Sequence, residues 1–187
     1  MSSLLSVDWS ELPVPEDDGA ADYLQGRAWP ALVLPATDGR SVDLSALGGR
    51  GVLYIYPMTG HPDVALPEGW DDIPGARGCT PQSCAFRDHH AELQEAGAAW
   101  VHGLSTQTTA EQVEAAERLH LPFSLLSDAE LALVRALDLP SFAAGGMTRL
   151  KRMTLILREG VVEHVFYPVF PPDRNAADVL AWLRARP

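Results

Sequence analysis

One apolar run constrains the fold of this chain more than any other segment. It spans residues 51–56, from Gly51 to Tyr56, is almost continuously apolar and rich in β-forming residues, and ends at Pro57. A short run of this kind is typical of a strand that is buried on both faces. Because both faces of such a strand must be covered, we expect a central sheet with helices packed on either side.

Apolar periodicity and turn signals place the other elements around this strand. Further strands are expected at residues 31–34, 41–44, 100–104, 123–126, 153–157 and 161–166. Helices are expected at residues 81–96, 109–119, 128–137 and 175–185, the second of them capped by Thr109. Asp38-Gly39 and Gly160 mark the turns of two hairpins. The order of elements predicts an α/β chain with a thioredoxin-like fold, in which a hairpin precedes a mixed central sheet flanked by helices.

Composition changes only at the start of the chain. The first 26 residues carry six acidic residues and no basic residue, together with Pro13, Pro15 and Gly19. No internal repeat and no second composition regime follow. We therefore expect an acidic arm, residues 1–25, that is laid over a single domain formed by residues 26–187.

Charge and apolar patterning exclude several classes of partner. The 187 residues contain 14 lysines and arginines against 25 acidic residues, which gives a formal net charge of −11. Duplex nucleic acid and anionic membranes require cationic surfaces, so neither is expected as a partner. The start shows no signal-peptide pattern, and no apolar run approaches the ~18 residues of a membrane span. We expect a soluble, cytoplasmic protein.

The two cysteines, Cys79 and Cys84, lie where a long loop enters the first long helix. Two cysteines cannot form the framework of a small secreted scaffold, and in a reducing compartment paired thiols more often carry redox or metal chemistry. Thr80 and Pro81 resemble an N-cap and a first helical residue. The free N–H groups of a helix start favour an anion, so they favour the thiolate form of Cys79.

The spacing of the cysteines leaves two geometries open. If Cys79 lies inside the helix, ideal helix geometry puts the two Cα atoms about 8.7 Å apart, beyond the ~6.8 Å limit of an ordinary disulfide. A bond would then require the first turn to unwind. If Thr80 is the cap, the two cysteines occupy positions that often touch across a helix start, and the bond requires less movement.

The segments around this pair resemble the peroxiredoxins of the bacterioferritin-comigratory (PrxQ) type, in the alkyl hydroperoxide reductase and thiol-specific antioxidant superfamily. The resemblance rests on residues 54–57, 78–88, 121–128 and 152–157, and it extends from about Gly26 to the C-terminus. It implies a thioredoxin-like fold and the reduction of hydrogen peroxide and organic hydroperoxides. It also implies recycling by a thioredoxin-type dithiol.

The same resemblance implies roles for single residues. Cys79 would be the peroxidatic cysteine, Cys84 the resolving cysteine that forms an intramolecular disulfide with it, and Arg152 the cation that holds thiolate and peroxide. Pro57 and Thr80 are expected at the substrate. Because sulfur carries the redox chemistry, neither a cofactor nor a metal is expected. The active unit is expected to be a monomer or a homodimer.

Two departures from the family pattern concern the pocket. Ala76 stands three residues before Cys79, where the family commonly has a Thr or Ser whose hydroxyl touches the thiolate. The 21 residues 58–78 also make an unusually long connection before the cysteine. We expect this loop to fold over the pocket, with Thr59 or Arg77 supplying the missing polar contact, or else to be a surface insertion near a dimer or reductant interface.

A basic cluster and a glycine pair complete the expectations for the second half. Arg149 and Lys151 are expected to be solvated, whereas Arg152 enters a buried strand and is expected to point at the pocket. Gly145-Gly146 is interpreted as a flexible connection.

Two alternative functions use the same cysteines. One is a thioredoxin-fold copper-binding metallochaperone, with Cys79, Cys84 and His164 as ligands. The other is a redox sensor that cycles its disulfide too slowly to clear peroxide. Tight Cu(I) binding without peroxide turnover would favour the first, and a slow rate would favour the second.

Overall fold

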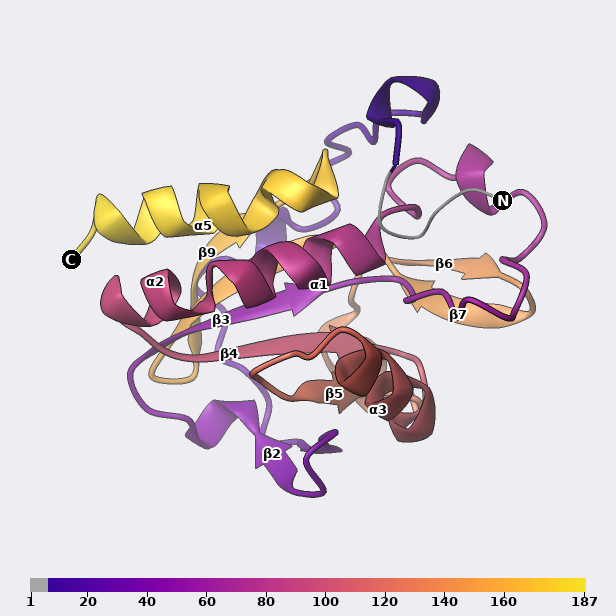
Figure 1. Ribbon diagram of the computed structural model, residues 1–187. Helices are drawn as coiled ribbons and strands as arrows, with labels where there is room; N and C mark the ends of the chain where they lie inside the picture. Colours follow the sequence, from indigo (N-terminus) through magenta and orange to yellow (C-terminus); the bar gives the residue numbers. More distant parts are fainter. Residues whose placement is uncertain (1–6) are drawn as a thin grey trace.

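The computed structural model describes residues 7–187, and its centre is a five-stranded mixed sheet in the order β5-β4-β3-β8-β9 (Figure 1). The strands are β3 (Arg50–Ile55), β4 (Ala98–Ser105), β5 (Leu125–Ser127), β8 (Met153–Arg158) and β9 (Val161–Phe166). β3 runs parallel to β4 and antiparallel to β8, so it lies in the middle of the sheet. The α/β, thioredoxin-like arrangement expected from the order of elements is confirmed.

The apolar run that dominated the sequence forms β3, and both of its faces are buried. Val52 and Tyr54 belong to one core cluster, and Leu53 and Ile55 belong to another. None of these four side chains is exposed to solvent. Two separate cores on opposite faces of one strand are the structural reason why the run carries no polar alternation.

Helices cover both faces of the sheet. The helices are α1 (Cys79–Asp88), α2 (His90–Glu95), α3 (Thr109–Arg118), α4 (Ala132–Leu137) and α5 (Asn175–Arg184). Figure 1 shows α1, α2 and α5 together along one face, where they contact one another. The core on the opposite face is completed by α4 and by segments near the N-terminus, including Leu24 and Trp29.

Three of the expected helices begin or end differently from the prediction, and one of them, expected from residue 128, begins at Ala132. The helix expected over residues 81–96 is interrupted at His89, where the backbone leaves helical geometry and α2 begins. The expected cap Thr109 is the first residue of α3, and the cap is Thr108. Thr108 and Glu111 form a reciprocal capping box, in which each side chain satisfies the other's backbone N–H.

A hairpin replaces the flexible connection that we expected around the glycine pair. β6 (Ser141–Ala144) pairs antiparallel with β7 (Met147–Leu150), and Gly145 and Gly146 form the turn between them. Both glycines have positive φ, 59° and 72°. A two-residue turn that matches the twist of its strands needs positive φ at both positions, which glycine adopts without steric cost.

The remaining short elements lie at the edges. β1 (Val33–Pro35) and β2 (Ser41–Asp43) form the predicted first hairpin. The 3-10 helices are η1 (Trp9–Glu11), η2 (Asp22–Leu24), η3 (Leu44–Ala46), η4 (Trp70–Asp72) and η5 (Pro172–Arg174). Within residues 7–187, no helix has the length and apolarity needed to cross a bilayer.

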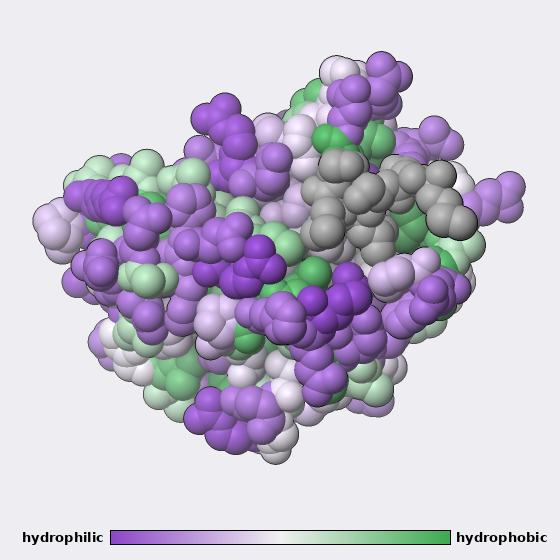
Figure 2. Space-filling view, in the orientation of Figure 1, coloured by the Kyte–Doolittle hydropathy of each residue, from purple (hydrophilic) through white to green (hydrophobic). Residues whose placement is uncertain are grey.

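The described part of the acidic arm lies against the rest of the chain. The indole Nε1 of Trp9 donates to Asp173 at 3.0 Å, and the Asp18 carboxylate pairs with Lys151 at 2.7 Å. Leu24 is fully buried in the core. Hydrophilic side chains cover most of the face seen in Figure 2, with apolar ones in small separate areas. Residues 1–6 of the expected arm lie outside the described residues.

Candidate active site

The start of α1 fixes the position of Cys79. The helix begins at Cys79 itself, and its N-cap is Gly78, so the expected cap at Thr80 is wrong. Gly78 has φ +107°, and a Cβ added there would lie 2.7 Å from the Trp9 ring. Only glycine fits this turn without strain, and it places the cysteine rather than the threonine at the first helical position. Of the two geometries left open by the spacing, Cys79 adopts the one inside the helix.

The Cys79 sulfur is buried and has polar neighbours on two sides. Only 3% of the surface of Cys79 is exposed to solvent. The Met58 backbone N–H points at Sγ from 3.4 Å, and Nη2 of Arg152 lies 3.1 Å from it. The thiol contacts the Ala76 carbonyl oxygen at 3.7 Å. An N–H group, a guanidinium and a helix N-terminus together stabilise a sulfur anion at this position.

Arg152 is held in place by carbonyl groups of the loop before α1. Its Nη2 donates to the carbonyls of Ala76 and Arg77 at 3.0 and 3.2 Å, and Nε donates to that of Gly75 at 3.2 Å. The residue is 4% exposed. Three loop carbonyls hold the planar guanidinium in place beside Cys79. Little conformational freedom of the Arg152 side chain is therefore lost when a substrate binds.

A buried polar network behind Arg152 was not predicted from the sequence. Nη1 of Arg152 donates to Gln82 Oε1, and Gln82 Nε2 donates to Asn175 Oδ1 at 3.0 Å. The Thr154 hydroxyl also donates to Asn175 Oδ1, at 2.6 Å. Gln82 and Thr154 are completely buried. The network joins α1, β8 and the start of α5, so it connects the orientation of Arg152 with the first turn of α1.

Cys84 lies on the same helix, five positions after Cys79, and is half-buried. Both cysteines are free thiols in this structure. With both inside one α-helix, their Cα atoms are about 8.7 Å apart by helix geometry, beyond the ~6.8 Å limit of a disulfide. A bond between them therefore requires the first turn of α1 to unwind.

The protonation of Cys84 leads to a pH prediction for the disulfide-forming step. Burial raises the pKa of the Cys84 thiol above its ordinary value of 9.0, and the nearby Arg87 cation opposes this only in part. Below that pKa, the thiolate fraction grows about tenfold per pH unit. If Cys84 closes the disulfide that the resemblance implies, the rate of disulfide formation after rapid oxidation of Cys79 by peroxide should therefore increase steeply between about pH 7 and about pH 8.5, which stopped-flow tryptophan fluorescence would follow. A rate of disulfide formation that does not change with pH would contradict the role of Cys84 as the resolving thiol. Arg87→Gln should slow this step throughout the range, because it removes a cation that lowers the pKa of Cys84.

The long loop between β3 and α1 folds over the cysteine. A cavity of about 10 Å³ above Cys79 has room for about one water-sized molecule. It is lined by the loop residues Met58, Gly60, Leu66, Trp70, Arg77 and Gly78, and by Cys79, Thr80 and Pro81. Trp70 is 3% exposed and packs near Phe142 of the β6–β7 hairpin. The loop is thus part of the pocket wall.

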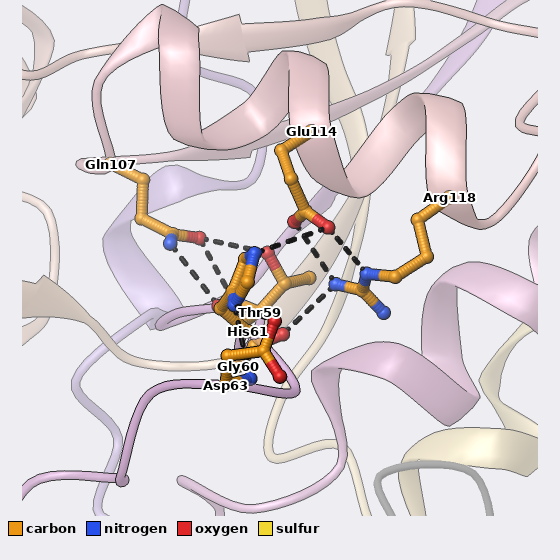
Figure 3. Close-up of polar contacts among 7 residues, drawn as sticks. All are labelled: Thr59, Gly60, His61, Asp63, Gln107, Glu114 and Arg118. Atoms are coloured by element: carbon orange, nitrogen blue, oxygen red, sulfur yellow. Dashed lines mark hydrogen bonds and ion pairs between the residues drawn. The ribbon is translucent and has the colours of Figure 1, made fainter.

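The structure brings some of the predicted substrate residues to this cavity and places one elsewhere. Arg77 and Thr80 line it, and the Arg77 guanidinium is also paired with Asp71 at 3.0 Å. Pro57 is buried at the end of β3, next to Met58. The Thr59 hydroxyl donates to Gln107 Oε1 at 3.1 Å, just before α3 (Figure 3), and Thr59 is not among the residues that line this cavity.

Three predictions outside the cysteine pair have separate outcomes. Arg149 was expected in solvent but is 6% exposed, since β7 carries it under the long loop. Lys151 is partly exposed and is paired with Asp18. His164, on β9, stacks against the Trp182 ring at 4.9 Å between centroids. Among residues 7–187, no group of three or more His, Cys, Asp or Glu side chains is arranged to hold a metal ion.

Sequence comparison identifies relatives over most of the chain. The family model described as Redoxin matches residues 24–180. Peroxiredoxin Q, chloroplastic, from Oryza sativa subsp. japonica is 34% identical over 163 residues, which cover 86% of this chain and 67% of that protein. Peroxiredoxin Q, chloroplastic, from Sedum lineare is 31% identical over 175 residues, or 92% of this chain and 84% of that protein.

Solved structures share the same fold. Peroxidoxin BcpB from Mycobacterium tuberculosis superposes with a TM-score of 0.70 at 28% identity, covering 87% of this chain and 97% of its own. The bacterioferritin comigratory protein of Xanthomonas campestris, studied for its alkyl peroxide reduction activity, has a TM-score of 0.62 at 24% identity. The matched region covers 93% of this chain and 96% of that one.

Proposed function

The chain belongs to the redoxin family, as a peroxiredoxin of the PrxQ type and thus a thiol-dependent peroxidase, and we propose that Cys79 attacks the peroxide and Cys84 resolves the product. The observation that carries this assignment is the 3.1 Å contact between Cys79 Sγ and Arg152 Nη2 at a helix N-terminus. Cys84 lies five positions further along α1, away from the helix N-terminus, and burial raises the pKa of its thiol.

The chemistry follows from the order in which the sulfurs act. The Cys79 thiolate attacks the terminal oxygen of the peroxide, the O–O bond breaks, and the leaving oxygen takes up a proton to become water or an alcohol. Cys79 becomes a sulfenic acid. The Cys84 thiolate then attacks its sulfur, and hydroxide leaves as water once protonated. Arg152 and the N–H groups at the start of α1 stabilise the charge that develops on the peroxide oxygens.

Recycling of the enzyme requires two electrons and two protons from outside the chain. An intramolecular disulfide is opened by thiol–disulfide exchange, so we propose a thioredoxin-type dithiol as the reductant. Both cysteines come from one chain, so a monomer or a homodimer can complete the cycle. Because such a dithiol is kept reduced only in a reducing compartment, we propose that the protein acts in the cytoplasm, which cell fractionation would test.

The metallochaperone alternative has weaker support. Its third ligand, His164, packs on Trp182, on a different element from the helix that carries both cysteines. The redox-sensor alternative uses the same chemistry as the peroxidase and differs from it only in rate.

Steady-state turnover tests the proposal. Purified protein with thioredoxin, thioredoxin reductase and NADPH is expected to consume many equivalents of hydrogen peroxide, followed as loss of NADPH absorbance. A single turnover with every dithiol tried would support the sensor instead. Stoichiometric Cu(I) binding with no peroxide consumption would support the metallochaperone.

A further inference from the structure

A second cavity adjoins the one above Cys79. It has a volume of about 350 Å³, which is within the size range of small-molecule sites. Met58, Gly60 and Leu66 line both cavities, so these loop residues form a wall that the two spaces share. Apolar loop residues form much of its wall: Met58, Val64, Ala65, Leu66 and Pro67.

Arg149 also lines this cavity, and two nitrogen atoms of its guanidinium have no hydrogen-bond partner among the described residues. The residue is 6% exposed, and its Nε and Nη1 atoms are buried without a hydrogen-bond partner among the described residues. Burial lowers the pKa of the Arg149 guanidinium, while the charges of Glu111 and Cys79 oppose this effect. A buried cation without a hydrogen-bonded anion is costly, and a bound anion would remove that cost.

The acidic side chains of the same wall already have other partners. Glu114 accepts from Arg118 Nε at 2.6 Å and lies 3.8 Å from His61, and Arg118 also donates to the Gly60 carbonyl (Figure 3). Glu111 accepts from the backbone N–H and hydroxyl of its capping residue at 2.8 and 2.7 Å. Neither carboxylate forms an ion pair with Arg149, so neither occupies the place that an incoming anion would take beside the guanidinium.

We propose that Arg149 binds the carboxylate of an organic hydroperoxide whose carbon chain occupies this apolar cavity and whose peroxide group reaches Cys79. The protein would then prefer hydroperoxy acids to neutral hydroperoxides of the same size. The proposal rests on the assignment of Cys79 as the attacking thiolate. The reaction is the one already described: the S–O bond forms, the O–O bond breaks, and the hydroxy acid leaves once its alkoxide takes up a proton.

Matched substrates test this proposal. The four-, six- and eight-carbon ω-hydroperoxy acids are each compared with their methyl esters as kcat/KM at constant ionic strength. For the best-fitting chain length, the wild type should favour the acid by about tenfold or more, the range of a charge-assisted hydrogen bond. Arg149→Gln should bring the acid-to-ester ratio close to one, chiefly through KM, and Arg149→Lys should restore part of it.

Arg135→Gln is the matched control, because it removes the same charge from an exposed position on α4 and should leave the ratio unchanged. An acid-to-ester ratio near one in the wild type would overturn the proposal. So would an equal loss for acid and ester in Arg149→Gln, since Arg149 would then act on the thiolate and not on the carboxylate. If the wild type reduces no peroxide at all, the assignment of Cys79 fails instead.

Discussion

Replacing Cys79 by serine is expected to abolish peroxide reduction. A serine hydroxyl is not ionised near neutral pH, so it cannot attack the O–O bond even with Arg152 beside it. Cys79 is buried and makes few polar contacts, so the fold should tolerate the replacement, which thermal unfolding would check. Peroxide consumption by Cys79→Ser above the rate of buffer would contradict the assignment.

Cys84→Ser is the matched variant on the same helix. It should consume one equivalent of peroxide and then stop, with the sulfenic acid of Cys79 accumulating because no thiol condenses with it. Trapping with dimedone followed by mass analysis would detect that species. If Cys84→Ser reacts like the wild type without accumulating sulfenic acid, the two roles are wrong.

The second large effect is expected at Arg152. Arg152→Gln removes the guanidinium 3.1 Å from the Cys79 sulfur and the donor aimed at the peroxide oxygens. Charge-assisted hydrogen bonds contribute about 1.5–3 kcal/mol, so the second-order rate of Cys79 oxidation should fall by a factor of about 10 to 150. Stopped-flow fluorescence after mixing with hydrogen peroxide would measure this rate, because Trp70 lines the cavity above the sulfur.

Folding has to be separated from catalysis in this experiment. Arg152 also satisfies the carbonyls of Gly75, Ala76 and Arg77, so its loss leaves buried acceptors without donors. Rates should therefore be normalised to titrated Cys79 thiol, and Arg152→Lys provides a variant that keeps the charge. A rate within about twofold of the wild type for Arg152→Gln would show that the guanidinium is not needed for the attack.

The parts of the fold that were predictable are those with local signals. The run from Gly51 to Tyr56 is typical of a strand buried on both faces, and all of it except Tyr56 lies in β3. The β6–β7 hairpin was missed because Ala143 and Ala144 give little strand signal. The signal that could have found it is Gly145-Gly146, a pair suited to a two-residue hairpin turn.

The parts of the site that were not predictable depend on distant contacts. Gln82 and Asn175 are 93 positions apart and have no shared sequence pattern, yet their hydrogen bond supports the start of α1. Arg149 is buried on β7, where it lines a cavity together with residues of the long loop. Side-chain preference favoured Thr80 as the N-cap, whereas the cap is Gly78, in a left-handed conformation with no room for a Cβ beside the Trp9 ring.

The position of Cys79 in the first turn connects catalysis with a conformational change. Gln82 lies between the two cysteines and is bound to both Arg152 and Asn175. Unwinding this turn to close a disulfide therefore disturbs the network that orients Arg152. The guanidinium is in place beside the free Cys79 thiol. We expect it to lose this position in a disulfide form and to regain it when the disulfide is opened.

Intact-mass analysis after a single turnover tests the central claim most directly. The reduced wild-type protein is mixed with one equivalent of hydrogen peroxide, quenched in acid and weighed without a reducing agent. We expect a monomer that has lost two hydrogen atoms and gained no oxygen, with Cys79 and Cys84 joined in one peptide after digestion. A stable gain of one oxygen atom, or a disulfide between two chains, would contradict an intramolecular Cys79–Cys84 cycle.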